Sequence, residues 1–210
     1  MTELGMRHRF VPAGDAALRP LLLLHGTGGS EDDLLPLGRA LSPGAALVSP
    51  CGAVDEGGAA RFFRRLAEGV FDEDDLRRRA GELAGFVAEA RARHGLGAPV
   101  AVGFSNGANI AAALMLLRPG VLAGAVLLRA MTPLRTTAEW RPPVGVLGGA
   151  PVLLLSGAAD TMVTAEDAAR LASQLAAAGG RVEHRTVPAG HGLSQADVDI
   201  AAEWMREHGR

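Results

Sequence analysis

The chain has 210 residues, of which 48% are hydrophobic and 21% are charged, and 21 basic residues against 23 acidic ones leave a net charge of −2. This composition is that of an ordinary globular protein. The near balance of charge argues against a partner that is nucleic acid or an anionic membrane, and the single cysteine excludes an intramolecular disulfide.

We expect one domain over residues 1–210, because no internal repeat, low-complexity block or linker divides the sequence. The first 14 residues contain no apolar core of signal-peptide length. The longest apolar runs are too short to span a bilayer. These features predict a cytoplasmic protein that does not insert into membranes.

Short apolar runs alternate with longer amphipathic stretches, which is typical of a parallel sheet whose strands are connected by helices. The runs lack polar alternation, as expected when helices cover both faces of the sheet. The sequence therefore predicts an α/β fold with a mostly parallel central sheet. Its expected strands are Leu21–Leu24, Ala46–Ser49, Pro99–Phe104, Gly124–Leu128, Pro151–Leu155 and Val182–Val187, with a weaker one at His8–Val11.

Apolar residues at steps of three and four predict a helix from Asp75 that closes at Gly95. The acidic run Asp72–Asp75 is expected to be a solvated helix start. Residues Asn106–Leu117 are apolar nearly all round, which indicates a buried helix. Thr164 and Ser194 each precede a helical stretch and are expected to be N-caps.

The segment Gly103-Phe104-Ser105-Asn106-Gly107 matches G-x-S-x-G and lies between a predicted strand and a predicted helix. In that setting the serine occupies a strained turn and projects its hydroxyl above the sheet. Glycines are needed there because a Cβ would collide with the neighbouring strand and helix. A glycine-rich turn with a capping serine is the alternative. We expect Ser105 to be a nucleophile.

A serine nucleophile needs a histidine base that a carboxylate orients, in the chain order Ser, acid, His. Three histidines follow Ser105. His184 lies inside a predicted strand and His208 is close to the chain end. His191 is flanked by glycines between the last strand and the last helix, so it is the expected base, although a solvent-exposed loop histidine is the alternative.

Asp160 follows the strand Pro151–Leu155 and leaves the carboxyl edge of the sheet, as Ser105 does. Asp167 is better explained as a first-turn helix residue. Asp160 is therefore the expected acid, with a role in a local turn as the alternative.

Acyl transfer also requires N–H donors for the developing oxyanion. We assign one to the backbone N–H of Asn106, which follows the nucleophile, and the other to Thr27, in the glycine-rich loop after the strand Leu21–Leu24. His25 is expected to bond loop backbone. A phosphate-binding loop is poorly supported, because no G-x-x-x-x-G-K-[ST] motif and no lysine are present.

Two long connections, Cys51–Asp74 and Arg129–Gly149, are expected to shape a shallow substrate pocket. Packing onto the core is an equal alternative for their apolar side chains, and Arg61 and Arg129 are weak candidates for reading an anionic substrate group. The candidate pocket residues are Phe62, Phe63, Met131 and Leu134, together with Phe71 and Trp140.

Taken together, Leu-His-Gly-Thr-Gly-Gly, Gly-Phe-Ser-Asn-Gly, Ser-Gly-Ala-Ala-Asp and Ala-Gly-His resemble the phospholipase/carboxylesterase branch of the α/β-hydrolases, which is related to dienelactone hydrolases. The segment from Arg61 to Asp72 is similar to a sub-branch described as hydroquinone-type carboxylesterases. Two positions depart from these families: Asn106 stands where the branch usually has Gln, and Ser105 stands where dienelactone hydrolases have Cys. Cys51 lies elsewhere and is expected to pack or to sit in a loop.

The resemblance implies an α/β-hydrolase and suggests a homodimer. A chain of 210 residues leaves little room for an inserted lid domain, so we expect the minimal form of the fold, with no cofactor and no metal. The expected activity is hydrolysis of short-chain or small aromatic esters through an acyl-enzyme. The same residues would serve a thioesterase, a lysophospholipase or a lactone hydrolase. An alternative of another class is a catalytically silent protein that binds small molecules on this fold.

Overall fold

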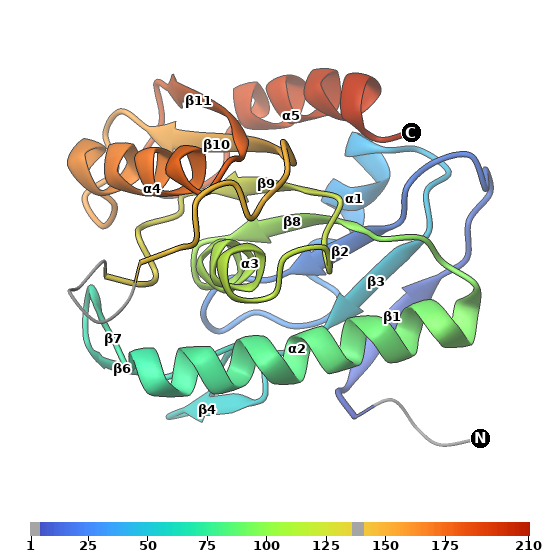
Figure 1. Ribbon diagram of the computed structural model, residues 1–210, viewed down its shortest axis with the longest axis horizontal. Coiled ribbons are helices and arrows are strands. Elements are labelled where there is room, and N and C mark those ends of the chain that lie inside the picture. Colours follow the sequence, from blue (N-terminus) through green and yellow to red (C-terminus); the bar gives the residue numbers. More distant parts are fainter. Residues whose placement is uncertain (1–4, 136–140) are drawn as a thin grey trace.

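A seven-stranded sheet forms the centre of the molecule in the computed structural model, which describes residues 5–135 and 141–210 (Figure 1). Its strand order is β1-β3-β2-β8-β9-β10-β11, and every neighbouring pair is parallel except β1 and β3. The strands are β1 (His8–Val11), β2 (Leu21–Leu24), β3 (Leu47–Pro50), β8 (Val100–Phe104), β9 (Gly124–Leu128), β10 (Pro151–Gly157) and β11 (Arg181–Val187). The α/β fold expected from the sequence is confirmed.

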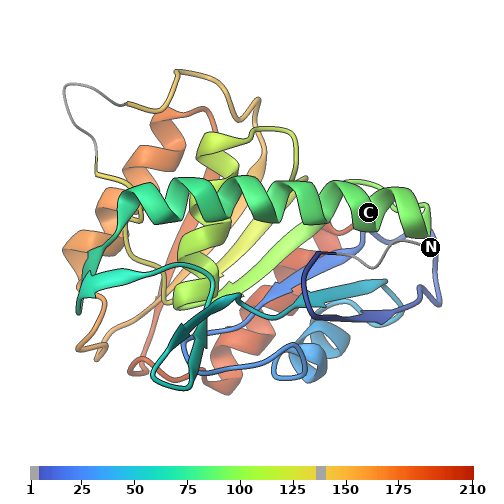
Figure 2. The ribbon, with the colours of Figure 1, turned by 90° about the horizontal axis from the view of Figure 1, so that it is seen from below.

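Helices cover both faces of this sheet, which explains why its central strands are apolar without alternation. One face packs on α1 (Leu35–Leu41) and α5 (Gln195–His208), and receives Leu21 and Leu23 of β2. The other packs on α2 (Glu73–His94), α3 (Asn106–Leu117) and α4 (Ala165–Ala177). Figure 2 shows α2 extended across this second face.

The helix boundaries follow the predicted capping residues. The Thr164 side chain accepts a hydrogen bond from the Asp167 N–H at 3.1 Å. The Ser194 N–H donates to Asp197 at 2.8 Å, and Gly95 closes α2 with a φ of 65°. These bonds satisfy terminal amides that no helical partner reaches.

Two features differ from the sequence analysis. Helix α1 was not predicted, because seven residues are too few for a helical period to show. The connection expected as a loop between residues 51 and 74 folds into two hairpins, whose turns use the positive φ of Gly57, Gly58 and Gly69. Their strands are β4 (Val54–Glu56), β5 (Ala59–Arg61), β6 (Arg65–Ala67) and β7 (Val70–Phe71).

The N-terminus of α3 lies unusually close to the ends of β2 and β8. A Cβ on Gly107 would stand 2.0 Å from the carbonyl oxygen of Leu24, and one on Gly103 would stand 2.6 Å from that of Gly107. Only glycine fits at either position, because the obstructing atoms belong to the backbone. This contact fixes where the strand-to-helix turn at Ser105 sits above the sheet.

The described residues contain no helix that combines the length and the apolar composition needed to cross a membrane.

Replacing Gly107 by Ala should lower the free energy of unfolding by about 2 kcal/mol or more, because the added methyl group overlaps immovable backbone. Gly85→Ala in α2 is the matched control, since its Cβ would meet nothing within 4 Å. It should raise the same quantity by about 0.5–1 kcal/mol through helix propensity. Urea unfolding measures both changes, and equal stabilities for the two variants would contradict the close contact.

Candidate active site

Ser105 occupies the turn between β8 and α3 with a φ of 51°, a left-handed conformation that is uncommon for a residue with a side chain. Its N–H donates to the carbonyl oxygen of Leu128 at 2.9 Å, which ties the turn to the end of β9. The strain is of the kind that a surrounding structure must over-determine. The close glycine contacts at either side of the turn provide that constraint.

The structure brings together the three residues predicted to form a triad. The Nε2 atom of His191 lies 3.0 Å from Ser105 Oγ, and its Nδ1 atom lies 2.9 Å from Asp160 Oδ2. The Asp160 side chain is fully buried, whereas that of His191 is 22% exposed. With the Nδ1–H donating to the carboxylate, Nε2 is left to accept the serine proton.

Asp160 is held as a carboxylate. Burial raises its pKa, but N–H donors from Val163 and Met162 and the contact with His191 outweigh that effect, so the pKa lies below its usual value. The two amides reach Oδ1 at 3.0 and 2.8 Å. One carboxylate oxygen is thus fixed by backbone and the other is directed at the imidazole.

The loops that carry Asp160 and His191 are joined by backbone contacts. The Ala159 N–H donates to the carbonyl oxygen of Ala189 at 2.9 Å. Gly157 permits the approach, because a Cβ there would stand 2.3 Å from the carbonyl oxygen of Gly190. The loops of Asp160 and His191 therefore position each other.

A second serine–histidine hydrogen bond joins Ser156 Oγ and His184 Nε2 at 2.9 Å. Both residues lie within strands, β10 and β11, and not at a helix N-terminus. Among the described residues no carboxylate contacts His184. Burial lowers the pKa of His184 and no acid opposes the effect.

Thr27 and Asn106, the predicted oxyanion donors, both line a cavity beside Ser105 and His191. Within the described part of the chain, neither backbone N–H donates to a protein acceptor. The Asn106 N–H stands at the start of α3, where helix amides have no intrahelical partner and the helix dipole favours negative charge.

The Asn106 side chain has a role that the sequence did not reveal. Its Oδ1 accepts the N–H of Phe62 at 2.8 Å, and Asn109, one turn further on α3, accepts the N–H of Met131 at 3.0 Å. The only signal in the sequence was two amides on an otherwise apolar helix. They anchor the two long connections to the helix that follows Ser105.

The cavity has a volume of about 50 Å³. Met131 and Phe71 line it, but three other predicted pocket residues do not: Phe62, Phe63 and Leu134 are buried in the core cluster under α2 and α3. Trp140 lies outside the described residues. The sequence could not separate these cases because both connections are apolar and only their folding decides which side chains turn inward.

Arg61 is a cavity residue whose guanidinium holds the loop that carries Thr27. Its Nη1 donates to Thr27 Oγ1 at 2.6 Å and its Nε to the carbonyl oxygen of Phe63 at 3.2 Å. The Oε2 atom of Glu56 lies 3.4 Å from Arg61 Nε. Burial lowers the pKa of Arg61, and Glu56 offsets part of that effect.

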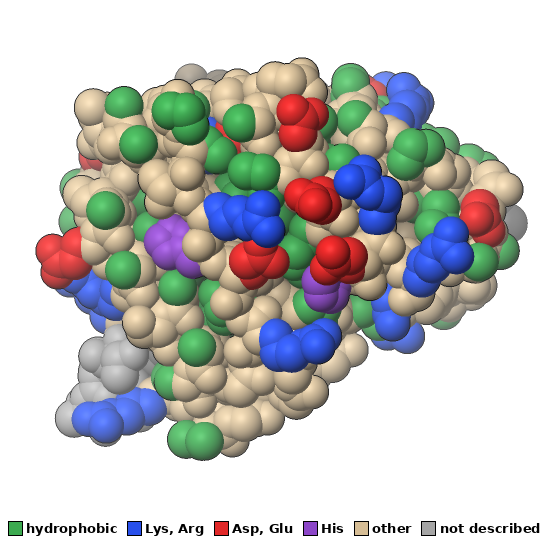
Figure 3. All heavy atoms as spheres, turned by 90° about the horizontal axis from the view of Figure 1, so that it is seen from above, with side chains coloured by type: hydrophobic (Ala, Val, Ile, Leu, Met, Phe, Trp, Pro, Cys, Tyr) green, Lys and Arg blue, Asp and Glu red, His purple; other side chains and the backbone are tan. Residues whose placement is uncertain are grey.

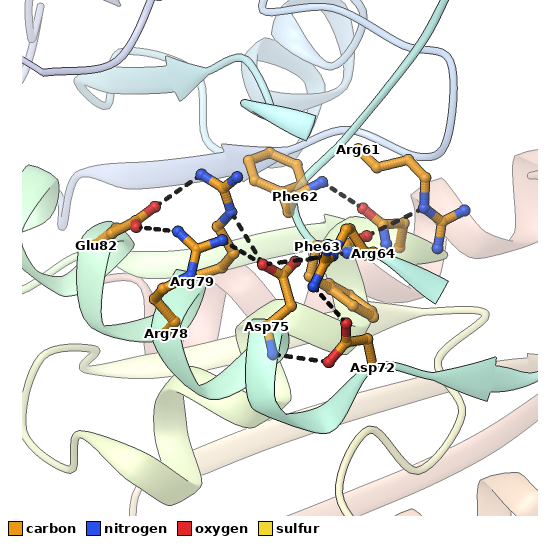
Figure 4. A network of polar contacts seen from close by, with 10 residues as sticks. Arg61, Phe62, Phe63, Arg64, Asp72, Asp75, Arg78, Arg79 and Glu82 are labelled. Carbon is orange, nitrogen blue, oxygen red and sulfur yellow. Dashed lines mark hydrogen bonds and ion pairs between the residues drawn. The ribbon is translucent and has the colours of Figure 1, made fainter. Parts of the chain in front are cut away.

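The hairpin segment that contains Arg61 is fastened to α2 through a buried carboxylate (Figure 4). Asp75 Oδ2 accepts the N–H of Arg64 at 2.8 Å, and its other oxygen contacts the guanidinium groups of Arg78 and Arg79. The expectation that the acidic run is solvated is therefore wrong at Asp75, which is only 3% exposed. Folding of the preceding hairpin over this end of α2 buries it.

His25 bonds loop backbone, as expected. Its Nδ1 lies 2.6 Å from the carbonyl oxygen of Gly26, and its Nε2 accepts the N–H of Gly52 at 2.9 Å. This pattern requires a neutral ring with the proton on Nδ1. Burial lowers the pKa of His25, although the Gly26 carbonyl opposes the effect.

No group of His, Cys, Asp and Glu side chains within residues 5–135 and 141–210 is arranged to hold a metal ion. On the face shown in Figure 3, acidic and basic side chains are interspersed and neither sign forms a continuous patch.

A mostly parallel sheet with this strand order and a serine on the β8–α3 turn defines an α/β-hydrolase. The chain belongs to the phospholipase/carboxylesterase family, whose model matches residues 72–209. It is 43% identical over 189 residues to the putative hydrolase MhqD of Bacillus subtilis (strain 168). That match covers 89% of this chain and 92% of MhqD.

Solved structures agree with this placement. The Bacillus cereus carboxylesterase matches with a TM-score of 0.92 and 39% identity, covering 97% of this chain and 95% of that one. A carboxylesterase from Mesorhizobium loti matches with a TM-score of 0.89 and 33% identity, covering 98% and 97%. The family resemblance expected from the sequence motifs is confirmed, and the chain is a serine ester hydrolase.

The neutral state of His25 should make stability depend on pH. Below the usual His pKa of 6.5 the unfolded chain binds a proton there that the folded chain does not, so the free energy of unfolding should fall as pH falls. Urea titrations between about pH 5 and about pH 8 should show a weaker decline in His25→Gln, which has no proton to gain. Parallel declines in the two proteins would contradict the assignment.

Proposed function

We propose that the protein hydrolyses short-chain or small aromatic carboxylic esters through an acyl-enzyme on Ser105. The observation that carries the proposal is the continuous hydrogen-bonded chain from Ser105 through His191 to the buried Asp160, at the wall of a cavity. This series of hydrogen bonds has the geometry that activates a serine hydroxyl, which is a poor nucleophile at its free pKa.

In the first half-reaction His191 Nε2 takes the proton of Ser105 as Oγ attacks the ester carbonyl carbon. The carbonyl oxygen becomes an oxyanion, for which the N–H groups of Thr27 and Asn106 are the proposed donors. Collapse of this intermediate breaks the bond to the alkoxy oxygen, and the imidazolium returns its proton to the leaving alcohol. The acyl group remains on Ser105.

In the second half-reaction water enters in place of the alcohol. His191 takes a proton from that water as its oxygen attacks the acyl carbon, and the same donors hold the second oxyanion. The intermediate then releases the carboxylic acid while His191 protonates Ser105 Oγ. Asp160 stays ionised throughout and stabilises the imidazolium that forms in each half.

The size of the cavity supports small acyl groups. About 50 Å³ is much smaller than the pockets that enclose drug-sized ligands, which hold about 300–1,000 Å³. Its apolar wall comes from Phe71, Met131, Met162 and Val163. This wall suits a short aliphatic acyl chain. Thioesters and lactones of similar size use the same machinery and are candidate substrates.

Ser105→Ala should reduce kcat for p-nitrophenyl acetate and butyrate by at least about 1,000-fold, since loss of the nucleophile removes the covalent route. Ser156→Ala is the matched control, because Ser156 also bonds a histidine. That variant should keep kcat within a few-fold of wild type. Initial rates of p-nitrophenolate release, with a folded circular-dichroism spectrum for each variant, provide the measurement.

Three outcomes would overturn the proposal. Wild-type turnover by Ser105→Ala would remove Ser105 from the chemistry. A large loss in Ser156→Ala with full activity in Ser105→Ala would transfer the nucleophile to β10. Absence of turnover by the wild type on a panel of small esters, thioesters and lactones would favour a silent binding protein on this fold.

A further inference from the structure

Arg129 is a fully buried arginine at the end of β9, and all five of its N–H donors have protein acceptors. Two bonds, at 2.8 and 2.7 Å, form a bidentate pair with the carboxylate of Asp197 on α5. The other three reach the carbonyl oxygens of Leu155, Gly190 and Gly192 at 3.3, 2.9 and 3.1 Å. The hypothesis that Arg129 reads an anionic substrate group is therefore wrong, because no donor is left for it.

Two of these acceptors stand immediately before and after His191. Glycine on either side gives the loop wide backbone freedom, so its sequence alone does not define where the imidazole points. The guanidinium binds the carbonyl of each glycine, and Asp197 connects the same group to the first turn of α5. Asp197 also accepts the N–H and the hydroxyl of Ser194, which fixes the far end of the loop.

This arrangement is hard to explain by stability alone. A buried ion pair loses hydration, and replacing it with apolar residues of the same volume often leaves the stability unchanged or raises it. Arg129 also has a φ of 57°, which a residue with a side chain rarely adopts. What an apolar pair could not do is hold two carbonyl groups in fixed positions on either side of one histidine.

We propose that Arg129, paired with Asp197, is a positioning residue that holds the His191 loop so that the imidazole meets Ser105 and Asp160 together. The proposal rests on His191 being the base, as set out under the proposed function. Neither Arg129 nor Asp197 touches the reacting atoms. Their effect passes through the backbone of the loop.

Arg129→Lys tests the geometry while it keeps the charge. A lysine ammonium has three donors on one atom and cannot reach both glycine carbonyls and the carboxylate as the planar guanidinium does. We expect kcat for p-nitrophenyl butyrate to fall on the order of 100-fold with KM little changed, because a misplaced base affects the transition state more than substrate binding.

A spectroscopic measurement distinguishes a displaced His191 imidazole from a general loss of stability. The Nδ1 proton of His191, hydrogen-bonded to Asp160, should give a far-downfield proton resonance in the wild type that broadens or is lost in Arg129→Lys. Leu83→Ala in α2 is the control, because Leu83 is a buried core residue remote from the loop. Assayed below its melting temperature, it should keep both kcat and the resonance.

The double variant Arg129→Met/Asp197→Asn covers the case in which a single change prevents folding, since it leaves no unpaired buried charge. If it folds with reduced kcat and a weakened Nδ1 signal, the proposal is supported. Wild-type kcat and an intact signal in this variant, or an equal loss of kcat in Leu83→Ala, would overturn it. His191→Ala tests the proposed function separately from the role of Arg129. Unchanged turnover in that variant would refute the proposed function itself.

Discussion

The contact between the N-terminus of α3 and the ends of β2 and β8 is the constraint on which the site depends. Gly103 and Gly107 let backbone meet backbone without intervening side chains, and Ser105 is forced into a left-handed conformation between them. The same placement leaves the first amides of α3 beside the cavity. It also sets Asn106 and Asn109 where their side chains bind the two long connections. The same backbone contact therefore positions the proposed nucleophile, one proposed oxyanion donor and the connections that line the cavity.

Buried polar side chains stabilise the loops that surround this centre. His25 fastens the glycine-rich loop after β2 to the chain beyond β3, and Arg61 binds Thr27 in the same loop. Arg129 holds the loop of His191, and Asp75 holds the hairpin segment to α2. Each group replaces lost hydration with several hydrogen bonds, which is the condition under which a buried polar group is tolerated. Glycine-rich loops thereby acquire defined positions without a large core of their own.

The sequence predicted most of the sheet, because apolar runs bounded by turns are a local signal that long-range packing rarely reverses. It also predicted that Ser105, Asp160 and His191 would converge, since the carboxyl ends of parallel strands meet at one edge. It did not predict the hairpins between β3 and α2, whose strands are two or three residues long. Nor could it assign Arg129, whose partners Gly190 and Asp197 lie more than sixty positions away.

The central claim is that Ser105, activated by His191, is the nucleophile. Reaction of the wild type with a fluorophosphonate, followed by peptide mapping by mass spectrometry, tests it most directly, because the probe forms a stable bond only with an activated serine. We predict one label per chain, on the peptide that contains Ser105, and a greatly slowed reaction in His191→Ala. A label on Ser156, or equal labelling of Ser105 without His191, would contradict the account.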